Sequence, residues 1–479
     1  MSVKKQIAFN SFISVFSRIV YTLVSLVIIG VMTRYLGEKG FGEYSTVLAV
    51  VYVFTVLADL GLYAITIRDI SRSGADEIKI VSNSFTLRAV AGLFLFTAGS
   101  LIIWFLPYST EVKRGIAIGS LAYWLFSNIN VLLGVFQKNL KMILVGLAEL
   151  IGRLVQLGLM LLAVKLRLGF VTFIWAMTIG ALVHASLVII FSRRIVPFHL
   201  EFDFVYWKKL LKESFPLAAS SVLVMFYFKF DTLMLSLMKP QEDVGIYSVA
   251  YKVLENLIFL PAMFVGLIMP LISKSFFDNL AYFKRIINST QRIFIVVATP
   301  LFFGGALLAK KIVMLLAGRN FLPATGVLVI LLAALTAIFF GTIYSSVLIA
   351  ISKQKLLTLT YGLGAVFNFG LNLFFIPRFS YTGAAITTFL TELLVTIVMA
   401  WLLYREIKFV PSFRPVWPVL AASLLMSWII YWLRALNLLE LVALGGLTYF
   451  LSLYAFGGIK KEDLKLFFKD ETIAMPNIP

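Results

Sequence analysis

The chain has 479 residues, of which 61% are hydrophobic and only 14% are charged, and its mean hydropathy is +0.97. A soluble domain is about half apolar and about one quarter charged, so this composition excludes a soluble protein and predicts a polytopic membrane protein. The net charge of +19 is also typical of nucleic-acid binding, but apolar segments leave no soluble basic face, so we expect no nucleic-acid partner.

Apolar segments of membrane-spanning length follow one another along the whole chain. About twenty apolar residues cross a hydrocarbon core of about 30 Å. Such segments lie at about 11–35, 41–64, 81–106, 115–136, 142–164, 170–191, 215–238, 244–272, 291–309, 325–350, 356–376, 383–404, 416–434 and 439–456. We therefore predict an all-α polytopic protein with about 14 transmembrane helices.

Two polar connectors divide these spans into three groups. Residues 192–214 carry five basic side chains between the sixth and seventh spans, and residues 405–414 precede the last two spans. We expect an N-terminal six-helix bundle over residues 1–200 and a second six-helix bundle over 201–410. Residues 411–479 would hold two extra helices and a cytoplasmic tail.

The distribution of Lys and Arg predicts the orientation. With the N-terminus in the cytoplasm, the inside segments hold about twice as many basic residues as the outside loops. This excess follows the positive-inside rule. We expect a multi-pass protein of the cell (inner, cytoplasmic) membrane with both termini in the cytoplasm.

The second group of spans resembles the first. An offset of 203 residues aligns these pairs: Phe12 with Phe215, Ser17 with Ser220, Gly42 with Gly245, Tyr44 with Tyr247 and Ser45 with Ser248. Asn83 before the third span similarly matches Asn288 before the ninth. Six helices separate the copies, so both insert in the same orientation, which is the parallel-repeat plan of some secondary transporters.

The clearest family signature lies in the first seventy residues. It consists of Arg34-x-Leu36-Gly37, Phe41-Gly42-x-Tyr44-Ser45, Ala58-Asp59-Leu60-Gly61-Leu62 and Ile67-Arg68. This pattern resembles the polysaccharide transporter family, the Wzx-type oligosaccharide flippases, within the superfamily of multidrug, oligosaccharidyl-lipid and polysaccharide exporters. The resemblance implies transfer of a polyprenyl-linked saccharide to the outer leaflet through a cationic cavity, by alternating access and driven by an ion gradient. It also implies that the last two helices form a groove for the polyprenyl tail, with a peripheral brace as the alternative.

Basic side chains inside the spans are the candidate substrate-binding residues. A charged residue at this depth usually faces a bundle interior or a water-filled cavity, and a pyrophosphate headgroup needs several cationic donors. Arg18 and Arg88 have no carboxylate three or four residues away on their own helix, and we add Arg153 and Lys252 to this set. Snorkelling to the interface is the alternative for Arg88.

Acidic side chains inside the spans are the candidate ion-coupling residues: Asp59, Glu149, Asp231 and Glu255. We expect Asp231 or Glu255 to take up and release H⁺ or Na⁺, with no other cofactor. The spacing of Glu149 with Arg153 and of Lys252 with Glu255 also fits ion pairs that hold helices together. A static charge network therefore remains an alternative to coupling.

Two asparagines of the eleventh span, Asn368 and Asn372, are most simply interhelical hydrogen-bonding groups. Contacts to substrate sugars are the alternative for both side chains.

Motifs for an enzyme are absent from the sequence. It has no GxxxxGK[ST] loop, no HExxH motif and no cysteine, so nucleotide-dependent, zinc-dependent and cysteine-based catalysis lack their usual residues. We predict a non-enzymatic flippase for a lipid-linked oligosaccharide, in contact with membrane lipids and other polysaccharide-assembly membrane proteins. The alternatives are a cation-coupled multidrug exporter and a membrane-embedded polysaccharide polymerase or ligase.

Overall fold

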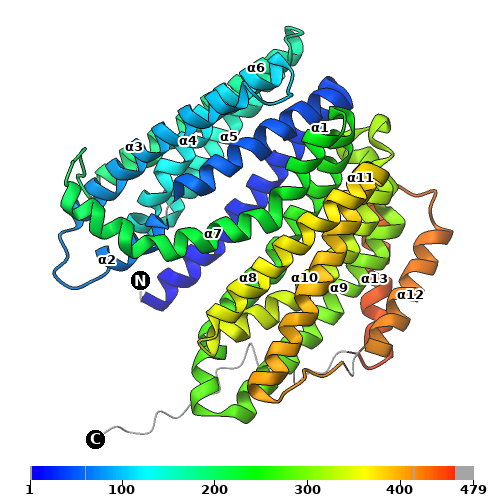
Figure 1. Ribbon diagram of the computed structural model, residues 1–479. Helices are drawn as coiled ribbons and strands as arrows, with labels where there is room; N and C mark the ends of the chain where they lie inside the picture. The colour runs from blue at the N-terminus through cyan, green and yellow to red at the C-terminus, as the bar shows by residue number, and fades with distance from the viewer. Residues whose placement is uncertain (1–2, 60, 414–415, 459–479) are drawn as a thin grey trace, which may run out of the picture. The chain divides into compact units, whose positions relative to one another are not determined.

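The computed structural model describes residues 3–59, 61–413 and 416–458, and all regular structure in these residues is helical (Figure 1). Side chains are described for the same residues except 3–19, 21, 64 and 215–228. The helices are α1 (Val3–Asp59), α2 (Leu62–Ile70), α3 (Glu77–Ile103), α4 (Thr110–Lys138), α5 (Met142–Lys165), α6 (Phe170–Arg193), α7 (Phe204–Met238), α8 (Gln241–Asp278), α9 (Leu280–Ala317), the 3₁₀ turn η1 (Arg319–Phe321), α10 (Ala324–Ala350), α11 (Gln354–Ile407), α12 (Val416–Trp432) and α13 (Leu438–Ala455).

Helices α1 and α11 each hold two of the expected spans. Helix α1 bends at Gly37, whose φ of 68° lies in the left-handed region that glycine adopts without steric cost. Helix α11 bends at Ser380, with φ 48°, and the Ser380 hydroxyl donates a hydrogen bond to the Asp243 carboxylate. With α1 and α11 each counted as two spans, the long helices of the described chain match the fourteen predicted spans. The prediction of an all-α polytopic protein is therefore confirmed.

Side chains cap several helix ends, where the first backbone N–H groups have no intrahelical acceptor. Asp76 accepts a hydrogen bond from the backbone N–H of Lys79 at the start of α3, and Ser109 caps α4. Asn437 and Glu440 form a reciprocal capping box at the start of α13. Each cap satisfies a backbone donor that the first helical turn leaves without an intrahelical partner.

The chain forms two compact units. Unit 1 comprises Met1–Val249, Leu315–Phe321 and Phe369–Ala384, and unit 2 comprises Ala250–Met314, Leu322–Asn368 and Ala385–Pro479. Helices α8, α9 and α11 thus contribute residues to both units. The bundle boundaries expected at residues 200 and 410 remain predictions, and the expected cytoplasmic tail from residue 459 lies outside the described residues.

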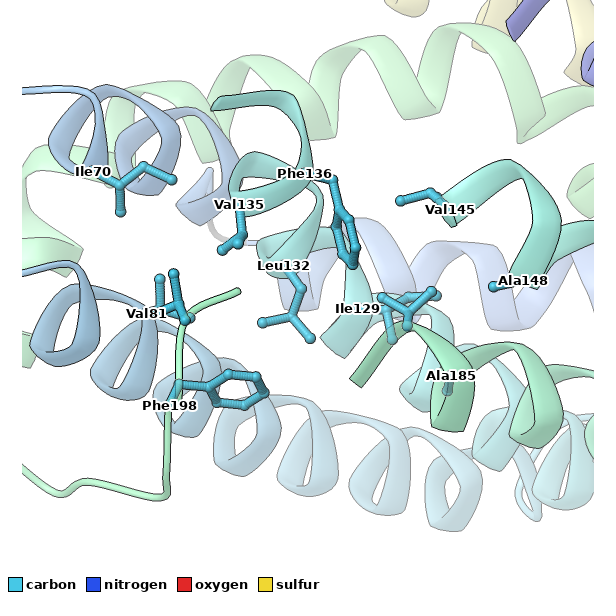
Figure 2. Packing of buried hydrophobic residues seen from close by; sticks show 12 residues of the cluster. Ile70, Val81, Ile129, Leu132, Val135, Phe136, Val145, Ala148, Ala185 and Phe198 are labelled. Carbon is cyan, nitrogen blue, oxygen red and sulfur yellow. The ribbon is translucent and has the colours of Figure 1, made fainter. Parts of the chain in front are cut away.

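A hydrophobic cluster ties α4 to its neighbours in unit 1 (Figure 2). Leu132 and Phe136 of α4 are fully buried in it. Around them pack Ile70 of α2, Val81 of α3 and Phe198 of the connector that follows α6. The connector therefore belongs to the core of unit 1.

This connector runs as a strap, residues 195–212, against the first turns of α3. The backbone N–H groups of His199, Glu201 and Asp203 donate to three α3 side chains, at distances of 3.0 to 3.1 Å. The α3 acceptors are the Ser82 hydroxyl, the Thr86 hydroxyl and the Asn83 amide oxygen, and all three side chains are buried. Consecutive contacts of this kind fix the path of the strap.

Matched glycines of the two repeats lie in direct contact in unit 1. A Cβ atom built on Gly42 would lie 1.7 Å from the carbonyl oxygen of Gln241, and one built on Gly245 would lie 2.2 Å from that of Glu38. Glu38 and Gln241 differ by the same 203 residues as Gly42 and Gly245. The contact is therefore pseudo-twofold: each repeat offers the same glycine to the same backbone position of the other.

Arg34 holds a second contact near these glycines. Its guanidinium donates hydrogen bonds to the carbonyl oxygens of Leu315 (2.6 Å) and Leu316 (3.2 Å), which precede the C-terminal residue of α9. Helix ends leave their last carbonyls without intrahelical donors and carry partial negative charge, so a cation there is stabilising. We call Arg34, Glu38, Gly42, Gln241 and Gly245 the bend cluster.

In unit 2, the last two helices pack on α9. Met426 and Ile430 of α12 and Leu441 of α13 are buried with Ile295 of α9. The Tyr449 hydroxyl of α13 donates to the carbonyl oxygen of Val296 at 2.6 Å. The C-terminal pair is therefore fixed to unit 2 through α9.

Candidate functional site

The fully buried Arg88 of α3 forms an ion pair with Asp59 at the end of α1, which is 30% exposed. Arg88 Nη2 lies 2.6 Å from Asp59 Oδ1, and Arg88 Nη1 donates to the Asp59 carbonyl oxygen at 3.3 Å. Arg88 Nε donates to the Ser127 hydroxyl at 3.0 Å, and the arginine side chain is 0% exposed. A predicted substrate-binding residue thus contacts a predicted ion-coupling residue. Arg88 could bind a headgroup only if its guanidinium left Asp59 and contacted the headgroup instead.

Asp231 of α7 is a buried carboxylate that accepts hydrogen bonds from two other helices. It is 2% exposed, and the Asn372 side-chain amide of α11 donates to its Oδ1 at 2.5 Å. The Tyr247 hydroxyl of α8 donates to its Oδ2 at 3.3 Å. Three helix segments of unit 1 meet at this carboxylate. A buried carboxylate at a junction of helices is a candidate group for the exchange of H⁺ or Na⁺.

Lys252 and Glu255 pair with each other on α8, within unit 2. Lys252 Nζ lies 2.6 Å from Glu255 Oε2, and the two side chains are 34% and 28% exposed. The side-chain amide of Asn256 also donates to the Lys252 carbonyl oxygen at 2.8 Å. The spacing of three residues predicted this contact between the two side chains. Their exposure makes the pair more accessible than that of Arg88 with Asp59.

The remaining candidates are Arg153 and Glu149 of α5 and Arg18 of α1. On α5, Arg153 Nη1 donates to the Gln156 side-chain oxygen at 2.8 Å, while Glu149 is half-buried one turn earlier. Arg18 lies in the first part of α1, and its side chain is outside the described residues. The predicted roles of Arg18, Glu149 and Arg153 therefore stay predictions.

Two partners of Asp231 were not assigned to its site by sequence reasoning. Asn372 stood out only as a polar amide in a span, and Tyr247 only as the repeat match of Tyr44. The signal for Asn372 was its polarity within an apolar segment, which predicted an interhelical hydrogen bond. Its hydrogen bond to Asp231 is such a bond. Asn368 also makes one, to the Thr391 hydroxyl at 3.5 Å in unit 2.

Acidic and imidazole side chains do not gather into a metal centre where the structure is described. Within the described residues, no three or more His, Cys, Asp or Glu side chains could hold one metal ion. The charged groups instead form pairs, or bind neutral amides and hydroxyls. Such groups can exchange a proton, a monovalent cation or an anionic headgroup.

Comparisons with known proteins show the family to which the chain is similar. Residues 7–276 match the family described as "Polysaccharide biosynthesis protein". A "Putative O-antigen transporter" of Shigella flexneri is 23% identical over 414 residues, which cover 83% of this chain and 97% of that protein. A "Probable flippase AglR" of Haloferax volcanii is 28% identical over 192 residues, which cover 39% of this chain and 40% of that protein.

Solved structures show the same fold. The lipid II flippase MurJ in its inward closed conformation has a TM-score of 0.75 at 16% identity, covering 94% of this chain and 98% of that chain. An inward-facing multidrug resistance MATE family transporter of the MOP superfamily has a TM-score of 0.68 at 14% identity, covering 81% and 94%.

These relatives confirm the prediction of a transporter-type membrane protein rather than an enzyme, because they are named transporters and flippases. They also confirm the family resemblance of the N-terminal motifs. The matched region covers more than half of the 479 residues. The chain belongs to the polysaccharide biosynthesis protein family.

Proposed function

We propose that the protein is a flippase that moves a polyprenyl-(pyro)phosphate-linked oligosaccharide from the cytoplasmic to the outer leaflet. The observation that carries this proposal is the match to nearly the whole length of a relative named as an O-antigen transporter. The fold shared with a lipid II flippase supports the same class of lipid-linked substrate. The protein would act in the cell membrane, with both termini cytoplasmic, beside other polysaccharide-assembly membrane proteins.

Arg18, Arg88, Arg153 and Lys252 would bind the phosphate groups and nearby sugars. Arg88 is the informative member, because a phosphate is the natural competitor of Asp59 for its guanidinium. Headgroup binding at Arg88 then releases the Asp59 carboxylate, which can take up a proton. Binding of the substrate would thereby change the protonation of Asp59 in the first repeat.

Asp231 would be the principal coupling group for H⁺ or Na⁺. Its burial supports this role, as does its position, because hydrogen bonds from Asn372 and Tyr247 hold the carboxylate where three helix segments meet. Glu255 and Glu149 are the secondary candidates. Movement of the ion into the cell down its gradient would return the empty transporter to its starting conformation. The protein would then act as an antiporter, with alternating access to the two leaflets.

A flipping assay tests the proposal. Purified protein is reconstituted into vesicles with a fluorescent polyprenyl-pyrophosphate oligosaccharide, and the fraction accessible to an outside quencher is followed with and without an imposed ion gradient. We expect protein-dependent, gradient-stimulated flipping. Export of cationic dyes without movement of the lipid would instead support a multidrug exporter, which the MATE-like fold makes the second candidate.

Three variants locate the chemistry within that assay. Arg18→Ala should strongly reduce flipping, and unchanged flipping would make Arg18 a structural residue. Asp231→Asn and Glu255→Gln should abolish or weaken the response to the gradient, and full gradient-driven transport in both would end the coupling proposal. Lys165→Gln, at an exposed end of α5, is a matched charge-removal control that should transport normally.

A further inference from the structure

The strap of unit 1, which includes the first turns of α7, exposes large apolar side chains outside the predicted spans. Leu200 is 59% exposed, Phe202 58%, Phe204 70% and Val205 84%. These four residues lie within six positions and are called here the apolar face of the strap; exposed apolar area concentrated in this way marks an interaction surface. The strap cannot turn this face inward, because hydrogen bonds to Ser82, Asn83 and Thr86 fix its opposite side.

The strap lies at the depth of a bilayer interface. Helix α3 begins at Glu77, and the strap is bonded to it at Ser82 to Thr86, which lie about 8 to 14 Å along the helix at 1.5 Å per residue. This is where the apolar span of α3 begins. The exposed face is therefore level with the boundary between lipid headgroups and hydrocarbon, where aromatic and aliphatic side chains insert readily.

Contacts between aromatic side chains support this part of the strap. Trp207, 8% exposed, lies against Phe202 and Phe204, with ring centroids 5.8 and 5.2 Å apart. The Trp207 Nε1–H donates to Asn83 Oδ1 at 3.0 Å. The apolar face is thus presented on a rigid base.

The strap and the residues directly beside it, 193–213, carry five basic and three acidic side chains. Asp203 binds Lys79 at 3.0 Å and caps α7, and Glu213 binds Arg68 at 2.5 Å. Lys208, Lys209 and Lys212 on the first turns of α7 are exposed, and Arg193 and Arg194 at the end of α6 are exposed as well. Cations directly beside an interfacial apolar face are complementary to anionic lipid headgroups.

We infer that the strap is a binding surface for anionic phospholipid. Its apolar face inserts at the headgroup boundary, and its lysines bind lipid phosphates. The surface anchors the connector between the sixth and seventh spans to the bilayer, so the start of α7 is held by lipid as well as by α3. Lysine stems suit this position, because they lie along apolar surface while the ammonium reaches the phosphate layer.

Site-directed fluorescence tests where the face lies. The chain lacks cysteine, so Phe204→Cys and Val205→Cys can be labelled with bimane in nanodiscs that contain phosphatidylglycerol. Leu161→Cys, an exposed apolar site within α5, serves as the lipid control, and Ser73→Cys in the α2–α3 loop as the water control. We expect nitroxide lipids to quench both strap labels as at Leu161, with little quenching by aqueous iodide. Quenching by iodide alone, as at Ser73, would overturn the inference.

A charge-removal variant tests the preference for anionic lipid. Lys208→Gln, Lys209→Gln and Lys212→Gln are combined, and the ratio of phosphatidylglycerol to phosphatidylcholine retained by the purified protein is measured by native mass spectrometry. We expect that ratio to fall by about fivefold for each lysine. The control, Lys165→Gln with Arg167→Gln in the exposed α5–α6 loop, should leave the ratio unchanged.

Equal retention in the lysine variant and the parent would overturn the inference. The inference would also be overturned if iodide quenched the labels in nanodiscs but not in native membranes, because a protein partner would then cover the face in the native membrane. Unchanged thermal unfolding in detergent shows that the variant is folded. Both measurements are independent of flipping, so they stand apart from the proposed function.

Discussion

The two repeats agree where their backbones touch and differ where their spans carry charge. In the bend cluster, Gly42 and Gly245 make the same close contact to Gln241 and Glu38. Inside the spans, Tyr247 donates to the Asp231 carboxylate, whereas its match Tyr44 donates to the Met177 sulfur at 3.6 Å. The position that matches Asp231 in the first repeat is the buried Ile28.

This difference separates two kinds of constraint. A backbone crossing without room for a Cβ atom constrains both partners equally, so a repeat retains glycine on both sides. The proposed ion site needs its carboxylate only once, and a second buried carboxylate would add a desolvation cost. The first repeat instead buries the cation Arg88, which pairs with the partly exposed Asp59.

Removal of Arg88 should give the largest effect on stability. Arg88→Gln removes the ion pair with the partly exposed Asp59 and the hydrogen bond to Ser127, and since hydrogen bonds of a charged group contribute about 1.5 to 3 kcal/mol each, we expect a loss of about 3 to 5 kcal/mol. Lys252→Gln, which breaks the partly exposed pair of the second repeat, should cost much less, about 1 kcal/mol or below. Titration with a denaturing detergent gives the free energy of unfolding of each variant and of the parent.

A double variant separates the structural role of Arg88 from headgroup binding. Arg88→Met with Asp59→Leu removes both charges and should recover most of the lost stability. If the recovered protein also flips lipid-linked substrate at the parent rate, Arg88 does not bind the headgroup. A stable but inactive double variant is the outcome that our proposal expects.

Substitution of a matched glycine should have the next largest effect. The Cβ of Gly42→Ala would meet a backbone oxygen at 1.7 Å, so the helices must separate, at a cost of about 3 kcal/mol. Gly245→Ala should behave in the same way because its contact is the pseudo-twofold equivalent. Gly362→Ala, a helical site with nothing within 4 Å, is the control and should be neutral or slightly stabilising. A neutral Gly42→Ala would refute the close crossing.

The matched asparagines should differ by the number of hydrogen bonds that each accepts. Asn83 Oδ1 accepts from the Asp203 N–H and from Trp207 Nε1–H, whereas Asn288 Oδ1 accepts from the Ser412 N–H at 2.8 Å. We expect Asn83→Ala to cost about 2 kcal/mol, because it leaves the buried Trp207 donor unpaired, and Asn288→Ala about 1 kcal/mol. Thermal unfolding of the two variants compares them directly. Equal losses would mean that the Trp207 bond contributes nothing.

The sequence was sufficient for the fold but not for the pairing of charges. Long apolar runs identify spans because a bilayer forces each run into a helix, and the glycine and asparagine matches revealed the repeat. Spacing along one helix predicted the contact of Lys252 with Glu255. It could not predict the partner of Arg88, because Asp59 is on another helix. The strap stood out only as a basic connector, since its hydrogen bonds reach more than a hundred residues back to α3.

The smallest effect concerns Asp203, which holds the strap at the start of α7. Hydrogen bonds from the Tyr206 backbone N–H and from Lys79 lower the pKa of its carboxyl. A lowered folded-state pKa means that the stabilisation is complete above the ordinary aspartate pKa of about 3.9 and is lost as the pH falls through the folded-state value. Asp203→Asn retains a capping side chain but loses the ion pair with Lys79. Its thermal unfolding midpoint should therefore lie slightly below that of the parent at pH 7 and approach it as the pH falls below 4. A difference that stays constant over this pH range would show that the ionised carboxylate of Asp203 does not stabilise the strap. In the second repeat, the matching connector is bound to Asn288 through a backbone N–H group, which does not titrate.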